Sequence, residues 1–307
     1  MTRVLVSLLG VVLAMTVADA TGSRGASDPS ALAASAPLPF FYDLYTFRGD
    51  DHATAVVAAV AVPVGGLRRE RVDDRIRYRF DVRFVLADTV ERFVSRSLDS
   101  VYVSMTRPLT DRHLLHTFVE IDAPPSEGTV QRLVVTDATR PGVGQLHQSP
   151  FPIPDYDGTE LMLSDVAFGL PGATSGWSRH GHTLALLPTS QFPESEFDVY
   201  YEIYNLPAGR PYETEIAIEL LGGRGDGNGA VRARFSGEAE AGEDGVVAEL
   251  RRVESSLPMG RYRVTVAVTD RSTGRVASAS RPIQVRGWSS GMTMLPALSR
   301  VSESGIR

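Results

Sequence analysis

The segment Ile76-Arg77-Tyr78-Arg79-Phe80-Asp81-Val82-Arg83-Phe84-Val85-Leu86 decides the fold class of this chain. Apolar side chains occupy every second position, and charged side chains fill most of the positions between them. A period of two places the apolar set on one face of a β-strand and the charged set on the other, whereas a helix would spread both sets around its circumference. The segment therefore predicts a long strand with one buried face and one wet face.

Further strand-like segments flank this one on both sides. Residues 40–47 and the small apolar run 53–64 precede it, and the second of these is predicted to be buried on both faces. Strand-like runs follow at 90–94, 101–105, 114–121 and 130–136, with turn clusters between them. A parallel α/β fold would show amphipathic helices at these places, so the first half of the chain predicts a β-sandwich.

The second half repeats the all-β pattern. Residues 197–204 and 212–221 predict strands, and weaker strand patterns follow at 231–235, 246–250 and 282–285. The step Leu257-Pro258-Met259-Gly260-Arg261-Tyr262 enters an alternating strand and resembles the tyrosine corner of immunoglobulin-like sandwiches, in which the phenol bonds back to the preceding backbone. We therefore expect an immunoglobulin- or fibronectin-III-like second sandwich.

These patterns divide the chain into six parts. We expect a signal peptide, a flexible lead-in, two sandwich domains joined by a Gly-, Pro- and Ser-rich junction, and a disordered polar tail. Their expected ranges are 1–20, 21–39, 40–168 for the first sandwich, 169–192 for the junction, 193–287 for the second sandwich, and 288–307. The apolar islands at 161–168 and 184–187 are expected to add edge strands that pack the two domains together.

The N-terminal segment predicts export from the cytoplasm. Arg3 precedes an apolar run at 4–17, and Ala18-Asp19-Ala20 supplies the small residues of a signal-peptidase site, so we expect cleavage after Ala20. The alternative is an uncleaved anchor, but the run is shorter than the roughly 20 apolar residues that span a bilayer. The chain has no cysteine, which leaves neither a disulfide nor a site for lipid attachment. We expect a protein without a transmembrane anchor, in a periplasm or outside the cell.

The charge composition argues against nucleic acid as a partner. All 31 basic residues are arginine, and they are interspersed among 37 acidic residues for a net charge of −6. Nucleic-acid binding requires a concentrated basic face, which this balance does not predict. The exclusive use of arginine is typical of G+C-rich genomes and favours a bacterial source.

Two segments resemble a known bacterial family. The runs Leu161-Met162-Leu163-Ser164-Asp165-Val166 and Val199-Tyr200-Tyr201-Glu202-Ile203-Tyr204-Asn205-Leu206, on either side of a linker with Arg179-His180-Gly181, resemble the β-sandwich region of GWxTD-domain proteins. The resemblance extends over most of the chain. The Gly-Trp-x-Thr-Asp motif itself is absent, since Gly287-Trp288-Ser289-Ser290 and Gly176-Trp177-Ser178-Arg179 both depart from it at the fourth position. The resemblance implies an exported multi-domain β architecture and carries over no catalytic residue.

An aromatic cluster is the candidate ligand face. A period of two places Tyr200, Glu202 and Tyr204 on one side of the strand at 197–204 and Tyr201 on the other. An exposed Tyr200 and Tyr204 pair would form a platform for stacking on sugar rings, whereas buried rings would indicate core or inter-domain packing, the more common use of aromatics at strand spacing. The exposure of the two rings decides between these hypotheses.

Metal sites and cofactors are not expected. His180 and His182 would share one face of a strand, as metal ligands can, but no third ligand has a complementary spacing. Asp226 and Asn228 lie in a glycine-rich loop that could offer oxygens to calcium, yet a tight hairpin explains the glycines equally well. We interpret both segments as ordinary loops and expect no cofactor.

Taken alone, the sequence predicts a non-enzymatic binding or structural protein whose partner is another protein of the cell envelope. It contains no Gly-x-Ser-x-Gly elbow and no recognisable nucleophile triad. One alternative is a carbohydrate-binding module that uses Tyr200 and Tyr204. Another is a hydrolase with a divergent site at the domain junction, for which the nearest acidic or histidine candidates are Asp155, Asp157, Asp165 and His180.

Overall fold

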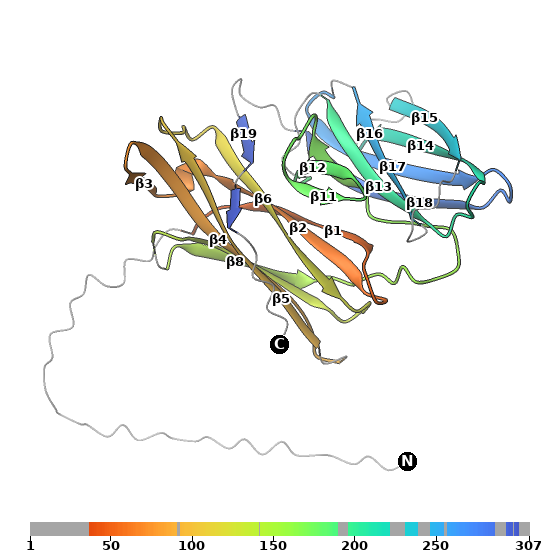
Figure 1. The fold of residues 1–307 in the computed structure, drawn as a ribbon, viewed down its shortest axis with the longest axis horizontal. Helices are drawn as coiled ribbons and strands as arrows, with labels where there is room; N and C mark the ends of the chain where they lie inside the picture. Colours follow the sequence, from red (N-terminus) through yellow and green to blue (C-terminus); the bar gives the residue numbers. More distant parts are fainter. Residues whose placement is uncertain are drawn as a thin grey trace, which may run out of the picture. The chain divides into compact units, whose positions relative to one another are not determined.

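The chain is an all-β protein, as the sequence predicts (Figure 1). The computed structural model describes residues 37–90, 93–140, 142–189, 196–221, 231–238, 246–254, 257–285, 293–296 and 298–300. These residues form sheets in which all but one of the strand pairings are antiparallel, and they contain no α-helix. The predicted signal peptide and most of the lead-in lie outside the described residues.

No helix in the described part of the chain has the length and apolar character needed to cross a membrane.

The first sandwich pairs a four-stranded sheet with a six-stranded one. The four-stranded sheet runs in the order β1 (Phe41–Arg48), β2 (Thr54–Pro63), β6 (His113–Ala123) and β19 (Thr293–Pro296), of which β19 is parallel to β6. The six-stranded sheet runs β20 (Leu298–Arg300), β5 (Phe93–Met105), β4 (Arg75–Asp88), β7 (Val130–Asp137) and β8 (Gly144–Pro150), with β3 (Arg69–Val72) also paired to β4. A 3-10 turn, η2 (Val64–Gly66), follows β2.

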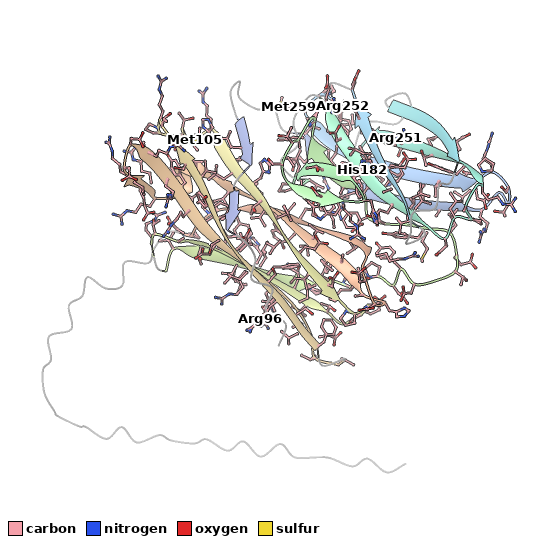
Figure 2. All side chains as sticks on the ribbon, viewed as in Figure 1. Arg96, Met105, His182, Arg251, Arg252 and Met259 are labelled. Atoms are coloured by element: carbon pink, nitrogen blue, oxygen red, sulfur yellow. The ribbon has the colours of Figure 1, made fainter. Side chains whose placement is uncertain are left out.

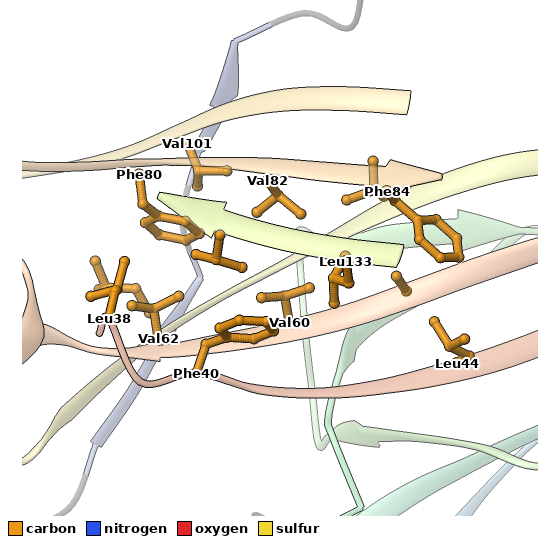
Figure 3. Close-up of a cluster of buried hydrophobic side chains, with 14 of the residues drawn as sticks. Leu38, Phe40, Leu44, Val60, Val62, Phe80, Val82, Phe84, Val101 and Leu133 are labelled. Atoms are coloured by element: carbon orange, nitrogen blue, oxygen red, sulfur yellow. The ribbon is translucent and has the colours of Figure 1, made fainter. Parts of the chain in front are cut away.

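The alternation that opened the sequence analysis builds the core of this sandwich. Phe80, Val82 and Phe84 of β4 are fully buried and pack with Val60 and other apolar side chains of the facing sheet (Figure 3). The arginines between them face away from this core. Burial of a large apolar side chain stabilises a fold by about 1.5–3 kcal/mol, so these few positions account for a large share of the stability of the first sandwich.

Strand β2 is buried on both faces, which confirms the prediction from its uninterrupted apolar sequence. Val56, Ala58 and Val60 contribute to the core of the first sandwich. Ala55, Val57 and Ala59 belong to a separate cluster, described below, that joins this sheet to the second sandwich. The small side chains of this second set allow two sheets to approach closely.

The second sandwich again pairs two sheets. One contains β11 (Trp177–Arg179), β12 (His182–Leu186), β10 (Ala167–Leu170), β13 (Phe197–Tyr204) and β16 (Val246–Val253), with β9 (Met162–Leu163) also paired to β13. The other runs β15 (Val231–Glu238), β14 (Pro211–Leu220), β17 (Gly260–Asp270) and β18 (Val276–Val285). The core between them includes Phe197, Tyr201, Ile216, Val264 and Val266.

The hydrogen bond expected of a tyrosine corner is present. The hydroxyl of Tyr262 donates to the carbonyl of Pro258 at 2.8 Å. This bond fixes the loop that leads into β17, one of the two inner strands of its sheet.

The tail, and the junction outside its apolar islands, contain more regular structure than expected. Strand β12 covers most of the island at 184–187 that was expected to add an edge strand, and it forms a hairpin with β11 that extends the sheet of β13. At Gly176, where φ is +143°, an added Cβ would lie 2.2 Å from the carbonyl oxygen of Leu184, so this hairpin requires a glycine there. Strands β19 and β20 lie in the range expected to be a disordered tail, and they pair with β6 and β5.

Candidate functional site

Strand β13 places the two candidate tyrosines at a buried boundary between sheets. Its side chains alternate, with Phe197, Val199, Tyr201 and Ile203 in the core of the second sandwich. Tyr200, Glu202 and Tyr204 lie on the opposite face, and all three are fully buried. The flat, exposed pair that sugar stacking requires is therefore not formed, and the rings serve packing instead.

Apolar side chains from both sandwiches cover Tyr200. The cluster around it contains Tyr45 and Phe47 of β1, the interface face of β2, and Trp177 of β11. The Phe47 and Trp177 rings stack with their centroids 4.8 Å apart, and Trp177 meets Tyr200 edge to face at 5.2 Å. This packing joins the four-stranded sheet of the first sandwich to the sheet of β13.

Glu202 is the polar centre of this boundary. Its carboxylate accepts hydrogen bonds from the hydroxyls of Tyr200 at 2.6 Å and Tyr204 at 2.7 Å. It also accepts one from Nε of Arg179 at 2.5 Å, and His180 Nε2 lies 3.6 Å away. A buried carboxylate is tolerated when it is paired and hydrogen-bonded in this way.

The tyrosines around Glu202 are held in the protonated state. Burial raises the pKa of Tyr200 and of Tyr204 well above the usual range, and the neighbouring Glu202 carboxylate raises both further. A phenol that donates to a carboxylate in a desolvated site loses its proton with difficulty. Neither hydroxyl is available as a base or nucleophile near neutral pH.

Arg179 links Glu202 to the first sandwich. Its guanidinium donates to the carbonyl of Arg48, which ends β1, and lies 3.9 Å from the Glu120 carboxylate of β6. Burial alone would lower the pKa of Arg179, but the charge and hydrogen bond of Glu202 outweigh it and raise that pKa. Arg179 therefore stays charged and bridges two carboxylates.

Glu120 and Arg48 complete the first sandwich's share of the network. Glu120 accepts a hydrogen bond from Trp177 Nε1 at 3.0 Å, and burial raises the pKa of its carboxyl. The backbone N–H of Arg48 donates to the Tyr204 hydroxyl at 2.8 Å, while its guanidinium lies 4.3 Å from the Tyr204 ring centroid.

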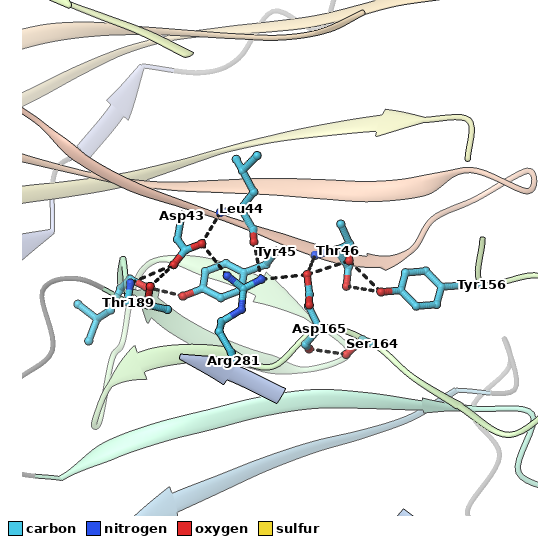
Figure 4. Close-up of polar contacts among 10 residues, drawn as sticks. Asp43, Leu44, Tyr45, Thr46, Tyr156, Ser164, Asp165, Thr189 and Arg281 are labelled. Atoms are coloured by element: carbon cyan, nitrogen blue, oxygen red, sulfur yellow. Dashed lines mark hydrogen bonds and ion pairs between the residues drawn. The ribbon is translucent and has the colours of Figure 1, made fainter. Parts of the chain in front are cut away.

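A second polar network joins β1 of the first sandwich to β18, which lies in the other sheet of the second sandwich (Figure 4). Arg281 of β18 donates to Asp43 of β1 at 2.6 Å and to Asp165 at 3.0 Å. Asp165 also accepts from the backbone N–H and the hydroxyl of Thr46. Burial opposes the charge on Arg281, but Asp165 and Asp43 outweigh it and raise the pKa of Arg281.

The residues proposed for a divergent hydrolase have separate partners. Asp157 contacts His52 at 2.5 Å on an exposed surface, Asp165 pairs with Arg281, and His180 lies beside Glu202. Asp155 accepts a hydrogen bond from the backbone of Asp157. Glu120 and Glu202 have the composition of a carboxylate pair for acid–base catalysis, but Arg179 bridges them and Glu202 is inaccessible to a substrate.

The histidines expected to be loop residues lie on the β11–β12 hairpin. His182 packs edge to face against Tyr200, with ring centroids 5.8 Å apart. Among the described residues, no group of three His, Cys, Asp or Glu side chains is arranged to hold a metal ion. Asp226 and Asn228 lie outside the described residues.

Sequence reasoning found Tyr200, Tyr204 and Glu202 through their period of two, but it missed the partners that neutralise them. Arg179 is 23 positions from Glu202, and Arg281 is 238 positions from Asp43. The chain has 31 arginines, and the residues around any one of them do not indicate which carboxylate it pairs with. The odd feature that could have drawn attention is Glu202 itself, since a carboxylate between two tyrosines on a buried strand requires a cation.

Comparisons with known proteins add only a general likeness. No family matches the chain, and no curated protein matches it. Among solved structures, red sea bream transglutaminase is similar at 12% identity and a TM-score of 0.24, over 80% of this chain and 31% of that one. Bacteroides uniformis β-glucuronidase 2 is similar at 10% identity and a TM-score of 0.26, over 75% of this chain and 26% of that one. The chain thus spans less than a third of the length of either protein.

Proposed function

We propose that the chain is an exported, non-enzymatic β-sandwich protein that works through contacts with another protein of the cell envelope. The observation that supports this proposal most is that partners within the protein already occupy the Glu202 carboxylate. Its carboxylate is fully buried, and two phenols and a guanidinium occupy it. The side chains most suited to chemistry hold the two sandwiches together instead of facing a substrate.

The second polar network supports the same conclusion. Asp43, Asp165 and Arg281 come from separate segments, and the one guanidinium pairs with both carboxylates. Buried charge networks of this kind fix the relative register of packed elements more than they add stability. A protein with two sandwiches held in this way presents its outer sheet faces and edges as a stable surface, which suits it to binding another protein.

Cross-linking in the native cell tests the proposal. The full-length chain with a C-terminal tag would be cross-linked in living cells, recovered through the tag, and analysed by mass spectrometry. We expect one protein in near-stoichiometric amount, with cross-links that map to the outer surface of a sandwich. A parallel sample without cross-linker identifies proteins that bind the resin alone.

Two results would overturn the proposal. Recovery of the chain alone, in cells that need it, would mean that it does not act through a stable protein contact. Recovery with envelope glycan only would favour a carbohydrate-binding protein. The mass of the mature chain in the same sample tests export, since cleavage after Ala20 removes the residues before Thr21.

A further inference from the structure

The outer face of the six-stranded sheet in the first sandwich is basic and apolar. The core face of β4 is apolar, and its opposite face carries Arg77, Arg79, Asp81, Arg83 and Val85. These side chains are half-buried or exposed. The face they share with β5, β7 and β8 is therefore the solvent side of the sheet.

Register places three arginines around one valine on this face. Val85 of β4 pairs with Arg96 of β5 on one side and with Arg132 of β7 on the other. Two strand spacings separate Arg96 from Arg132, or about 9.6 Å between backbones. Arg83 lies two residues along β4, diagonal to both and about 7 Å away. All three arginines are exposed, and Arg96 extends outward from β5 (Figure 2).

Apolar side chains lie between and beside the arginines. Arg83 pairs with Leu98 of β5 and with Val134 of β7, and Val134 in turn pairs with Leu146 of β8. Leu98 and Leu146 are 55% and 54% exposed, and Val94, further along β5, is 69% exposed. Arginines separate these three aliphatic side chains, so together they form a mixed basic and apolar surface and not one apolar patch.

The positive charge of this surface is only partly offset, by Asp81 on the same face and by Glu70, which pairs with Arg79. No ion pair joins Arg83, Arg96 or Arg132 to a described residue. The chain as a whole has a net charge of −6, so a basic face of this kind departs from its average. A group of like charges raises the energy of the unbound surface and attracts an acidic partner.

A cavity at one end of the same face is lined by charged and aromatic side chains. It has a volume of about 310 Å³, and its lining includes Arg77, Arg79, Asp81 and Tyr102. The Nε atoms of Arg77 and Arg79 are buried and make no hydrogen bond with any described residue, and Arg79 Nε lies 3.5 Å from a Glu70 oxygen. The Arg77 guanidinium lies over the Tyr102 ring at 5.4 Å. Buried guanidinium donors are normally satisfied, and a carboxylate oxygen is their usual acceptor.

We propose that this basic and apolar face binds an extended acidic segment of a partner protein, with one of its carboxylates bound by Arg77 and Arg79 in the cavity. The inference rests on the proposed role in protein contacts and names the chemistry of the partner. Side chains on the same side of an extended segment are about 6.6–6.8 Å apart. This spacing is close to the diagonal spacing that separates Arg83 from Arg96 and from Arg132, so successive same-side carboxylates can reach neighbouring arginines. Aliphatic side chains of such a segment would cover Leu98 and Leu146, which a uniform polyanion would leave in water.

Binding of a defined probe tests this inference. The probe is a fluorescein-labelled peptide in which glutamate and valine take turns at every second position with serine between them, so that both face the same side of an extended segment. It is titrated with the purified full-length chain and followed by anisotropy at low salt. We expect saturable binding that weakens with added salt and weakens about tenfold or more in the double variant Arg83→Glu and Arg132→Glu. The uncharged peptide of glutamine and valine should bind weakly to both proteins.

A matched charge reversal separates this surface from general electrostatics. Arg261→Glu changes an exposed arginine on β17 of the second sandwich and should leave peptide binding within about twofold. Circular dichroism and thermal melting would establish that each variant is folded. A conservative pair, Arg83→Lys and Arg132→Lys, should retain most of the affinity if charge dominates and lose it if bidentate contacts dominate.

Several outcomes would overturn the inference. One is that Arg261→Glu and the double variant bind the peptide equally. Another is that the chain binds dextran sulfate or anionic vesicles but not the peptide. A third is that the chain self-associates and the double variant abolishes this self-association. If a cross-linked partner is recovered equally with the double variant, the protein-contact function stands and this surface is wrong. If the wild-type chain recovers no partner while the peptide still binds through these arginines, the protein-contact function is wrong and the acidic-segment surface stands.

Discussion

At the scale of single residues, Glu202 determines whether the boundary between the sandwiches holds. Replacing it with alanine would leave the Arg179 guanidinium, whose side chain is 18% exposed, without its closest carboxylate, and would leave two buried phenols without acceptors. We expect Glu202→Ala to lower the free energy of unfolding by about 3–5 kcal/mol, measured by urea denaturation.

Glu160 offers a matched control for this change. Its side chain is 81% exposed and lies 3.6 Å from Arg275, so Glu160→Ala removes an exposed ion pair. Such pairs contribute about 0–1 kcal/mol. Equal effects of the two substitutions would contradict a structural role for the Glu202 network. In the double variant Arg179→Met and Glu202→Leu, the loss should be smaller than for Glu202→Ala, because the buried guanidinium is removed together with its closest carboxylate.

His116 is a residue whose burial makes stability depend on pH. It lies on β6, is 4% exposed, and its Nε2 has no hydrogen-bond partner in the described part of the chain. Burial lowers its pKa from 6.5 to about 4. The unfolded chain therefore takes up a proton from about pH 6.5 downward while the folded chain does not, so stability is lost as pH falls through this window.

The resulting prediction concerns a difference between two pH values. Between about pH 7.5 and about pH 5, His116 should cost the wild-type protein about 2 kcal/mol of unfolding free energy. His116→Phe removes the titrating group, so its loss over the same interval should be smaller by that amount. Urea denaturation at both pH values measures this, and any change in packing cancels in the comparison. An unchanged pH dependence would show that His116 titrates normally.

At the scale of elements, β2 shows how a strand can serve two cores. Ala59 is fully buried on the face toward the second sandwich. We expect Ala59→Leu to destabilise the protein by about 1–3 kcal/mol through overpacking. Ala267→Leu, on the half-buried outer face of β17, provides the comparison and should change stability by less than about 0.5 kcal/mol. Thermal melting of both variants measures these effects. A neutral Ala59→Leu would show that the two sandwiches are not closely packed at Ala59.

The elements differ in how far the sequence predicts them, for a physical reason. Strands β2 and β4 are long, and their own sequences predict their burial. Strand β2 is an apolar run, and β4 has apolar residues with a period of two. Of the hairpin of β11 and β12, only the apolar island at 184–187 was expected as an edge strand. The rest was expected to be a linker, since its order depends on a distant partner strand and on the close approach at Gly176. Strands β19 and β20 add to sheet edges through backbone hydrogen bonds. These bonds do not require particular side chains, so the sequence pattern does not predict them.

The same distinction applies to the candidate site. The face that holds Tyr200, Glu202 and Tyr204 follows from the alternation along β13. Whether that face is exposed or covered depends on β1 and β2, which are more than 130 positions away in the chain. The tertiary fold determines contacts over such separations, and a local sequence pattern does not predict them.

At the scale of the whole molecule, the boundary between the sandwiches should make the folded unit cooperative. Ten buried apolar residues form the cluster that joins them, and two charge networks flank it. Separating the sandwiches would expose this apolar surface and leave charges that no longer meet their partners. We therefore expect a single calorimetric transition in which the van't Hoff and calorimetric enthalpies agree.

Removing both networks should divide that transition. The double variant Glu202→Ala and Arg281→Ala retains each sandwich's own core but removes the charged links between them. Scanning calorimetry should then resolve two transitions, the lower one below the wild-type midpoint by about 2–4 °C for each kcal/mol lost. Glu160→Ala should keep one transition. Two well-separated transitions in the wild-type protein would mean that the sandwiches fold independently, and that the buried contacts of Glu202 and Arg281 do not couple them.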